Sequence, residues 1–417
     1  MREMKDSGIE WVGQIPKGWE LRRAKTLFTQ RNSKGNEIEV LLSPTQKYGV
    51  VPQSQLEGVV QVKEDTDLQM FKTVHKGDFV ISLRSFQGGF EYSLYEGVCS
   101  PAYQVFYPTS PICDTYYRYL FKSQSFISKM NNLTVGIREG KNIQYVDFAK
   151  SQIPVPPLAE QERIAAFLDA ECAEIDTVLE KTRASIEEYK KLKQAVITQA
   201  VTKGIRGDRP MKDSGIEWIG EIPAEWSVVP FSKFARVSAN LVNPSDYQDY
   251  LQVSPENIEK DSGKLLPCKT VSEVGVESWN HFFHKGQILY SKIRPKLNKV
   301  CIAPFDGLCS ADMYPIDTDN ISKFVVYTIL SNDFNQQVAM ITENRVKMPK
   351  INQKELSKII VVLPANRMEQ QEVVDYLDGE CGKIDALIAK KQQYLTEIEN
   401  YKKSLIYEYV TGKKEVI

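Results

Sequence analysis

Three short patterns in the chain have residue types that could support catalysis. His281 and His284 form an HxxH pair, but no Cys or acidic residue stands at a spacing that would complete a metal site. EYK at 188–190 matches the acid–x–Lys element of metal-dependent nucleases, yet no Pro-Asp dipeptide completes that motif. GIREGK at 136–141 is one residue short of a phosphate-binding loop and has no Ser or Thr after its Lys. We therefore expect a non-catalytic chain with no cofactor or metal site.

Basic side chains gather in two segments of the second half, where they offer binding chemistry. Residues 281–300, HFFHKGQILYSKIRPKLNKV, contain five Lys and Arg and no acidic residue, and residues 343–354, ENRVKMPKINQK, contain four more. The corresponding stretches of the first half, 75–93 and 134–145, are less basic. Loops that mix such residues with Gln, Asn, Tyr and Pro are typical of contacts with phosphates and base edges. A solvated surface without a ligand is the alternative interpretation.

The elements that would position these loops occur twice in the chain. MKDSGIEWVGQIPKGWE at 4–20 returns as MKDSGIEWIGEIPAEWS at 211–227, and HKG at 75–77 returns at 284–286. Matching blocks keep the same order along nearly the whole chain. A repeat of this length predicts two domain-sized halves rather than a solenoid.

Each half begins with short strands broken by turn residues. The segments Phe79–Leu83, Val98–Tyr107 and Gln287–Ile293 have the composition of strands. Tyr116–Lys129 and Phe324–Leu330 are better suited to short helices. This mixture predicts an α+β fold in each half.

A long helix is expected to close each half. Residues 158–203 contain no Gly or Pro, and Pro156-Pro157 and Gly204 are appropriate helix limits. Apolar residues recur at steps of three and four, as in a coiled coil. In the second copy, Gly379 and Gly382 are expected to weaken or bend the helix. The predicted stripe comprises Ile175, Leu179, Ile186, Tyr189, Val196, Ile384, Ile388, Leu395, Ile398 and Leu405.

Two such helices can bury each other's apolar stripe. Because they follow equivalent domains, a pseudo-two-fold arrangement would make them antiparallel, as a rod of roughly 45–65 Å. The alternative is that each helix packs on its own domain. We predict two similar globular domains at 1–157 and 207–366, separated by helical spacers at 158–206 and 367–417.

The composition is typical of a soluble cytoplasmic protein. The net charge is −1, and no apolar run approaches the roughly 18 residues that cross a bilayer. The polar start, MREMKDSGIE, does not resemble a signal peptide. Seven scattered Cys without a CxxC pair argue against a disulfide framework and a structural zinc site.

The repeated blocks resemble the specificity subunits of type I restriction–modification enzymes. These blocks are SGIEWVGQIPKGWE, KGDFVIS, IPVPPLAEQERIAAFLD and ECAEID, each with a second copy. The resemblance covers essentially the full chain, and PPLAEQ at 156–161 before a long helix is rather specific to that family. The second copy departs from this motif, because LPANRMEQ at 363–370 keeps one Pro and the Glu-Gln.

The resemblance implies a DNA-recognition subunit that is not itself a catalyst. Each half would contain a target recognition domain for one part of a bipartite, asymmetric DNA sequence, and the paired helices would fix the spacing. The helices would also help to dock two modification subunits, which are adenine methyltransferases, and restriction subunits would join that core. S-adenosylmethionine, ATP and magnesium would belong to these partners.

On this hypothesis, we predict DNA contacts by basic and amide side chains of both domains. They are Arg84, Gln87, Arg138 and Lys141 in the first domain, and Lys292, Arg294, Lys296, Lys299, Arg345, Lys347 and Lys350 in the second. One alternative is a coiled-coil scaffolding protein without sequence-specific DNA binding, which would bind other helices through residues such as Leu192 and Ile197. Another is a restriction enzyme with its own nuclease or methylation activity, and the missing motifs argue against it.

Inserting four residues near Arg183 adds about one helical turn and should lengthen the gap between the two halves of the recognised DNA sequence. The gap can be measured by mapping methylated adenines. An unchanged gap would mean that the helices do not set it.

Overall fold

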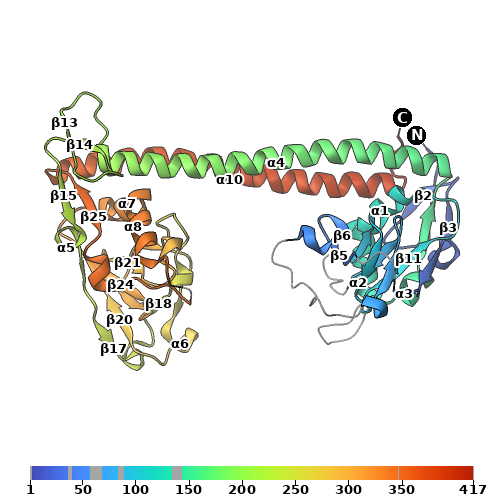
Figure 1. Ribbon diagram of the computed structural model, residues 1–417, viewed down its shortest axis with the longest axis horizontal. Helices are drawn as coiled ribbons and strands as arrows, with labels where there is room; N and C mark the ends of the chain where they lie inside the picture. The colour runs from blue at the N-terminus through green and yellow to red at the C-terminus, as the bar shows by residue number, and fades with distance from the viewer. Residues whose placement is uncertain are drawn as a thin grey trace. The chain divides into compact units, whose positions relative to one another are not determined.

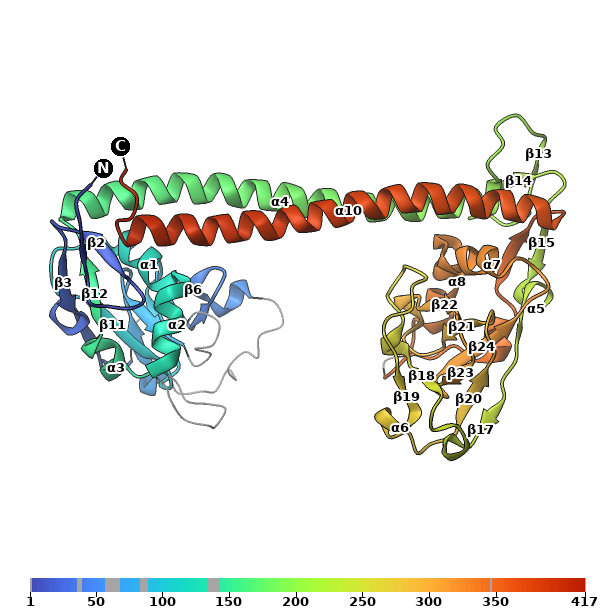
Figure 2. The same cartoon turned by 180° about the vertical axis from the view of Figure 1, so that it is seen from behind.

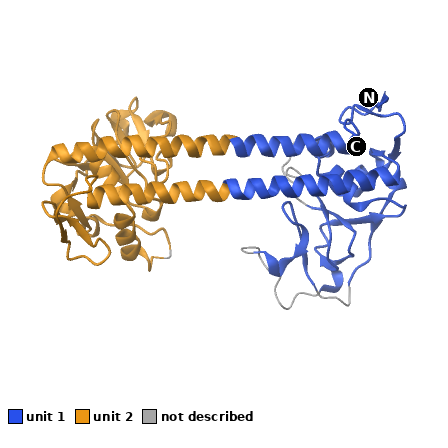
Figure 3. Cartoon of the chain, turned by 90° about the horizontal axis from the view of Figure 1, so that it is seen from above, with its two compact units in different colours: residues 1–182, 394–417 blue, residues 183–393 orange. Residues whose placement is uncertain are grey.

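The computed structural model describes residues 2–35, 40–56, 68–82, 89–133, 143–345 and 347–416. The chain forms two compact units (Figure 3). Unit 1 contains Met1–Thr182 and Tyr394–Ile417, and unit 2 contains Arg183–Gln393. Each unit therefore includes one mixed α/β body and a part of both long helices. The boundaries predicted from the sequence at 157, 206 and 366 separate recognition domains from helical spacers. These boundaries stay predictions.

Unit 1 is built around a four-stranded antiparallel sheet (Figure 1). The strand order is β4 (Phe28–Arg31), β11 (Gln104–Pro108), β8 (Phe79–Ile81) and β9 (Phe90–Tyr92). The two-stranded pairs are β1 (Met4–Asp6) with β2 (Gln14–Pro16), β3 (Glu20–Arg23) with β12 (Gln152–Val155), β5 (Leu42–Thr45) with β6 (Gly49–Pro52), and β7 (Lys72–Val74) with β10 (Gly97–Cys99). The short helices are α1 (Asp114–Lys122), α2 (Gln124–Leu133) and α3 (Tyr145–Lys150).

An aromatic core joins this sheet to the short helices. Phe28 of β4 lies within 6 Å of the rings of Phe79, Phe106 and Phe121. Tyr116, Tyr117, Leu120 and Phe121 of α1 are buried together, because residues four apart share one helix face. The body thus has its own hydrophobic centre.

Unit 2 repeats this plan with a larger second sheet. Its four-stranded sheet has the order β16 (Arg236–Val237), β24 (Met313–Asp317), β21 (Ile288–Ser291) and β22 (Val300–Ile302). The five-stranded sheet has the order β17 (Leu241–Val242), β20 (Asn280–Phe283), β23 (Gly307–Cys309), β18 (Leu251–Val253) and β19 (Lys269–Thr270), in which β18 and β23 are parallel. In this second sheet, β20 and β23 take the places of β7 and β10. Two pairs, β13 (Met211–Asp213) with β14 (Glu221–Pro223) and β15 (Ser227–Pro230) with β25 (Ile360–Leu363), and the helices α5 (Phe231–Phe234), α6 (Val271–Val274), α7 (Ser322–Leu330), α8 (Asn332–Thr342) and α9 (Gln353–Leu356) complete the body.

The duplication read from the sequence is present in the architecture. The order β4-β11-β8-β9 in unit 1 matches β16-β24-β21-β22 in unit 2. The expected strand Val98–Tyr107 is divided into β10 and β11, and the expected helix Tyr116–Lys129 is divided at Ser123. Ser123 adopts an extended backbone, and its hydroxyl donates to the carbonyl of Leu120. Local hydrogen bonding therefore ends α1 where the apolar pattern alone continues.

The two long helices are α4 (Leu158–Lys203) and α10 (Arg367–Val410). In unit 1, Lys402 pairs with Asp176 at 2.6 Å, and in unit 2, Lys193 pairs with Asp385 at 2.7 Å. A second contact in unit 1 joins Phe167 to Tyr409, and a second one in unit 2 joins Arg206, just after α4, to Glu372. Within each unit, position numbers thus rise along α4 as they fall along α10, so the helices are antiparallel (Figures 1 and 2). Lys193 and Lys402 stand at steps of the three–four pattern, so the stripe includes charged residues that pair across the two helices.

The apolar stripe is only partly as expected. Six of its ten predicted residues are buried, namely Ile175, Leu179, Ile186, Ile384, Leu395 and Leu405, and the other four are half-buried. Helix α10 continues through Gly379 and Gly382, and the buried Leu377, Cys381 and Ile384 surround these glycines. Ile197 is a correction: it was expected to be available to partner helices, but it is fully buried in the core of unit 2, whereas Leu192 is 48% exposed.

We call the repeated segments 4–20 and 211–227 the lead-ins, and the last Trp of each contacts the Glu of the Glu-Gln motif. In unit 1, the indole Nε1 of Trp19 donates to Glu160 at 2.9 Å, and Arg2 pairs with the same carboxylate. In unit 2, Nε1 of Trp226 donates to Glu369 at 2.8 Å, and Arg209 pairs with that carboxylate at 2.5 Å. Each Trp is fully buried, and each Arg also lies over its ring at 5.4 Å. In each unit, the Trp of the repeated segment thus binds the Glu of the Glu-Gln motif.

Each lead-in also contacts the end of the other long helix. Gly412 follows α10, and a Cβ at this position would lie 2.9 Å from Trp19. Gly204 follows α4, and a Cβ there would lie 3.3 Å from Trp226. Both glycines have a positive φ, which glycine adopts without strain. Each Trp therefore holds the start of one long helix beside the end of the other.

The Gln of the motif and a Tyr–Asp pair attach the body to the helix in both units. The side chain of Gln161 accepts the amide of Cys113 at 2.9 Å, and Gln370 accepts the amide of Ile321 at 3.0 Å. The hydroxyls of Tyr119 and Tyr327 donate to Asp169 and Asp378 at 2.7 and 2.6 Å. The two junctions thus make matching contacts, although their Pro residues differ.

Replacing Glu369 with Ala should destabilise the chain by about 3 kcal/mol, because the buried Arg209 and the Trp226 indole would lose their shared acceptor. Urea unfolding followed by tryptophan fluorescence measures the loss. Glu372→Ala is the matched control, since Glu372 pairs at the surface with Arg206 and its removal should cost less than about 1 kcal/mol. Equal losses in the two variants would contradict a special role for the Trp–Glu contact.

Candidate nucleic-acid interface

The two basic segments of the second half lie side by side in unit 2. Ile293 and Lys350 form an isolated antiparallel bridge. The amide of Arg294 donates to the carbonyl of Pro349 at 2.8 Å, and the amide of Ile351 donates to Lys292 at 2.9 Å. We call residues 292–299, 345 and 347–350 the basic loop pair. The first loop connects β21 to β22, and the second connects α8 to α9.

The loop pair holds an unusual share of strained backbone. Among the described residues, four residues other than glycine have a positive φ, and three of them belong to this pair: Arg294, Asn298 and Met348, at 43°, 44° and 45°. Arg294 and Met348 are each followed directly by Pro. Such conformations cost about 1–3 kcal/mol each and persist only where the surroundings enforce them.

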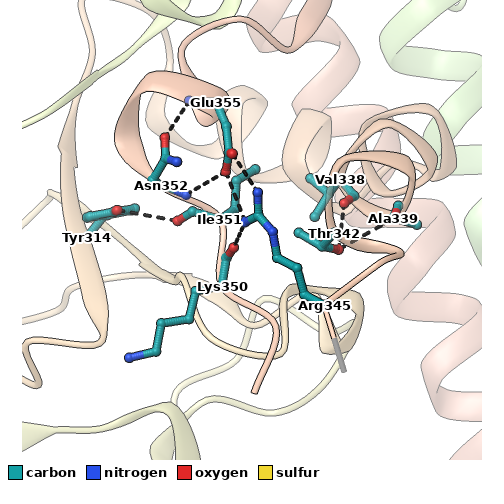
Figure 4. Close-up of polar contacts among 9 residues, drawn as sticks. All are labelled: Tyr314, Val338, Ala339, Thr342, Arg345, Lys350, Ile351, Asn352 and Glu355. Carbon is teal, nitrogen blue, oxygen red and sulfur yellow. Dashed lines mark hydrogen bonds and ion pairs between the residues drawn. The ribbon is translucent and has the colours of Figure 1, made fainter. Parts of the chain in front are cut away.

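Arg345 braces the second loop from within (Figure 4). Its guanidinium makes a two-pronged contact with Glu355, at 2.6 and 3.1 Å, and it also donates to the carbonyl of Lys350. Glu355 in turn forms the capping box of α9 with Asn352. The hydrogen bonds between the charged partners lower the pKa of Glu355 and raise that of Arg345. A DNA contact by Arg345 would have to compete with this carboxylate.

Three more of the predicted contacts are engaged within the protein. The ammonium group of Lys299 donates to the carbonyl of Pro255 at 2.6 Å. Lys350 pairs with Asp312 at 2.9 Å, and Lys292 lies 5.4 Å from the centre of the Tyr314 ring. These lysines tether the loops to neighbouring segments of unit 2.

Arg294, Lys296 and Lys347 differ from the tethered residues. All three are exposed, and no ion pair or side-chain hydrogen bond is recorded for them within the described ranges. Their charges can therefore meet phosphates or base edges without first giving up a partner. In the basic loop pair, four basic residues thus hold the loops in place, and the other three have exposed side chains.

The four predicted contacts of the first domain, Arg84, Gln87, Arg138 and Lys141, lie outside the described residues. Their positions along the chain nevertheless match those of the basic loop pair. Arg84 and Gln87 stand between β8 and β9, which correspond to β21 and β22. Arg138 and Lys141 stand between α2 and α3, as the second basic loop stands between α8 and α9.

Two of the three patterns that could suggest catalysis occupy ordinary structural positions, and the third, GIREGK at 136–141, lies outside the described residues. His281 is buried on β20, whereas the His284 side chain is 70% exposed, so the two do not form a joint site. Burial, followed by the charge of Lys292, lowers the pKa of His281. Glu188 and Lys190 form surface pairs with Lys191 and Glu187 along α4. Within the described ranges, no three His, Cys, Asp or Glu side chains come together as metal ligands.

Sequence reasoning missed the acidic and backbone partners that hold the loops. Glu355 and Asp312 bind Arg345 and Lys350, and neither belonged to the predicted site. The capping box at Asn352 and Glu355 was visible as a local signal in the sequence. Glu355 also accepts hydrogen bonds from Arg345, ten residues earlier, and this contact is evident only from the three-dimensional fold.

A cleft of about 1340 Å³ lies beside the basic loop pair within unit 2. Its lining includes Lys296, the 47% exposed Trp218, and one side of α4. Asp261 and Asp333 also line it, and burial raises the pKa of both carboxyl groups.

In the described part of the chain, no helix is both long enough and apolar enough to span a membrane.

The two α+β bodies share one plan, and unit 2 has an exposed basic loop pair. These features are typical of a nucleic-acid-binding protein. A family model described as the type I restriction modification DNA specificity domain matches residues 16–188. The chain is 32% identical over 351 residues to the EcoDI type I restriction enzyme specificity subunit of Escherichia coli, covering 78% of this chain and 76% of that one. It is 26% identical over 297 residues to the MjaVIII specificity subunit of Methanocaldococcus jannaschii, covering 67% and 66%.

Solved structures share the fold. A chain from work on complex assembly and conformational transition of the type I R-M system has a TM-score of 0.70 at 15% identity, covering 96% of this chain and 99% of that one. The HsdS subunit from Thermoanaerobacter tengcongensis has a TM-score of 0.50 at 14% identity, covering 96% and 98%. The chain belongs to the family of type I restriction–modification specificity subunits, which recognise DNA and are not catalysts.

Lys347→Ala should weaken DNA binding equally for all sequences and reduce the salt dependence by about one phosphate contact, without changing stability. Arg345→Ala should lower the thermal stability, because Glu355 loses its partner. Binding titrations at several salt concentrations and thermal melts measure both effects, with Lys269→Ala on β19 as a surface control. A stability loss in Lys347→Ala, or none in Arg345→Ala, would contradict the division into available and bracing cations.

Proposed function

We propose that this chain reads an asymmetric, bipartite DNA sequence. The α/β body of each unit would be the target recognition domain for one half of that sequence. The observation that carries the proposal is the basic loop pair, braced from within and offering Arg294, Lys296 and Lys347, on a frame that the chain contains twice. The near-neutral net charge means that affinity for phosphates depends on such local clusters. Phosphate contacts would set affinity and register, and base contacts would set the sequence.

The paired helices α4 and α10 would fix the separation of the two half-sites. Each is continuous over more than 40 residues, and the inter-helix ion pairs and the Trp–Glu contacts oppose sliding. A stiff helical spacer supports a constant gap better than a flexible linker, whose reach varies.

The helices would also dock the catalytic partners. These are two modification subunits, which are adenine methyltransferases, and restriction subunits that translocate and cleave DNA. S-adenosylmethionine, ATP and magnesium would be bound by those partners, and the complex would assemble in the cytoplasm on double-stranded DNA. Large apolar side chains exposed on the two helices support docking, since exposed apolar surface is typical of interaction sites. They include Val178, Leu192, Leu387, Tyr394 and Tyr401.

Exchanging residues 281–360 for the same region of a relative should change only one half of the recognised sequence, because the exchanged region includes the whole basic loop pair. The readout is the map of methylated adenines after co-expression with the modification subunit. An exchange of residues 75–150 is the matched control and should change only the other half. If either exchange altered both halves or neither, the modular assignment would be refuted.

A further inference from the structure

The strongest unexplained feature of the basic loop pair is the conformation of Arg294. Its φ of 43° and ψ of 53° lie in the left-handed region, where a Cβ atom crowds the following carbonyl oxygen. Glycine adopts this conformation without that cost, and Asn tolerates it better than a long side chain does. An Arg at this position therefore lowers stability relative to Gly, and its presence there suggests that its side chain has a function.

The backbone around Arg294 is fixed on both sides. Its amide donates to Pro349 at 2.8 Å, its carbonyl accepts the amide of Leu297 at 2.8 Å, and Pro295 follows directly. The isolated bridge between Ile293 and Lys350 holds the preceding residue. The Cα–Cβ direction of Arg294 is therefore set by the protein before any ligand binds.

The side chain of Arg294 is free, while its basic neighbours are not. Lys292, Lys299, Arg345 and Lys350 all contact groups within unit 2. Arg294 is exposed, and no side-chain partner is recorded for it among the described residues. Because the backbone is already fixed, only the side chain of Arg294 remains to be ordered on binding, and its guanidinium is available to a ligand.

The guanidinium group also matches one base better than the others. Its planar fork can donate two hydrogen bonds to O6 and N7 of guanine in the major groove. Lys296 and Lys347 are flexible point charges, which suit phosphates and distinguish bases poorly. We propose that Arg294 is a specificity-determining residue that reads a guanine in the half-site of unit 2, and that Lys296 and Lys347 contact phosphates. This assignment rests on the proposed function and deepens it.

Arg294→Gly is the direct test, because it removes the fork and relieves the backbone strain in one step. The complex with the modification subunits is tested on duplexes randomised in the half-site that the 281–360 exchange alters. We expect the wild type to prefer guanine at one position by about 5- to 150-fold, and the variant to lose this preference. Its thermal stability should equal or exceed that of the wild type. Arg294→Lys, which keeps the charge, should also lose the preference.

Two controls separate base reading from loop flexibility and from charge. Asn298→Gly introduces glycine at another left-handed position of the same loop, and because Asn298 is buried, the guanine preference should remain. Lys347→Ala should reduce methylation of all sequences in parallel. A guanine preference that survives in Arg294→Gly, or that disappears equally in Asn298→Gly, would overturn the assignment. A wild type without any preference in this half-site would instead refute the proposed function.

Discussion

The fold depends on one buried contact that the chain makes twice: a tryptophan indole and an arginine share a glutamate at the start of a long helix. In unit 2, Arg209 and Glu369 are each 6% exposed, so both charges have lost most of their water. Two desolvated charges stabilise a fold only when their geometry is good and their other polar atoms are bonded. The indole of Trp226 provides the second bond to Glu369, and its ring covers the guanidinium. Changing any one of the three groups leaves the others buried and incomplete.

This contact is one of several that attach each body to the long helices. The same Trp that binds the start of one long helix packs against the glycine that ends the other. The adjacent Gln and Tyr–Asp bonds then attach α1 or α7 to the helix. Within each unit, the body is thus fixed to the helices at several points. In the basic loop pair, four of the seven basic residues hold the loops, and the other three are exposed.

Much of the fold could be predicted from the sequence, because its signals are local and repeated. The limits of α4 follow from Pro156-Pro157 and Gly204, and the duplication follows from matching blocks. The site was less predictable, because residue type does not reveal pairing. Arg345 and Lys347 look equivalent in the sequence, yet only Arg345 faces the carboxylate of Glu355. Ile197 appeared to stand outside the helical stripe, but packing of the unit 2 body covers it. The left-handed backbone of Arg294 has no signal in residue type at all.

The most direct test of this account is to place a photo-crosslinking side chain at Lys347 and irradiate the assembled complex on its target duplex. The account predicts crosslinks confined to one half-site, on the strands of the sequence that the 281–360 region determines. Crosslinks spread evenly along the duplex, or located in the spacer between the half-sites, would contradict the claim that the basic loop pair is the DNA-reading surface of unit 2.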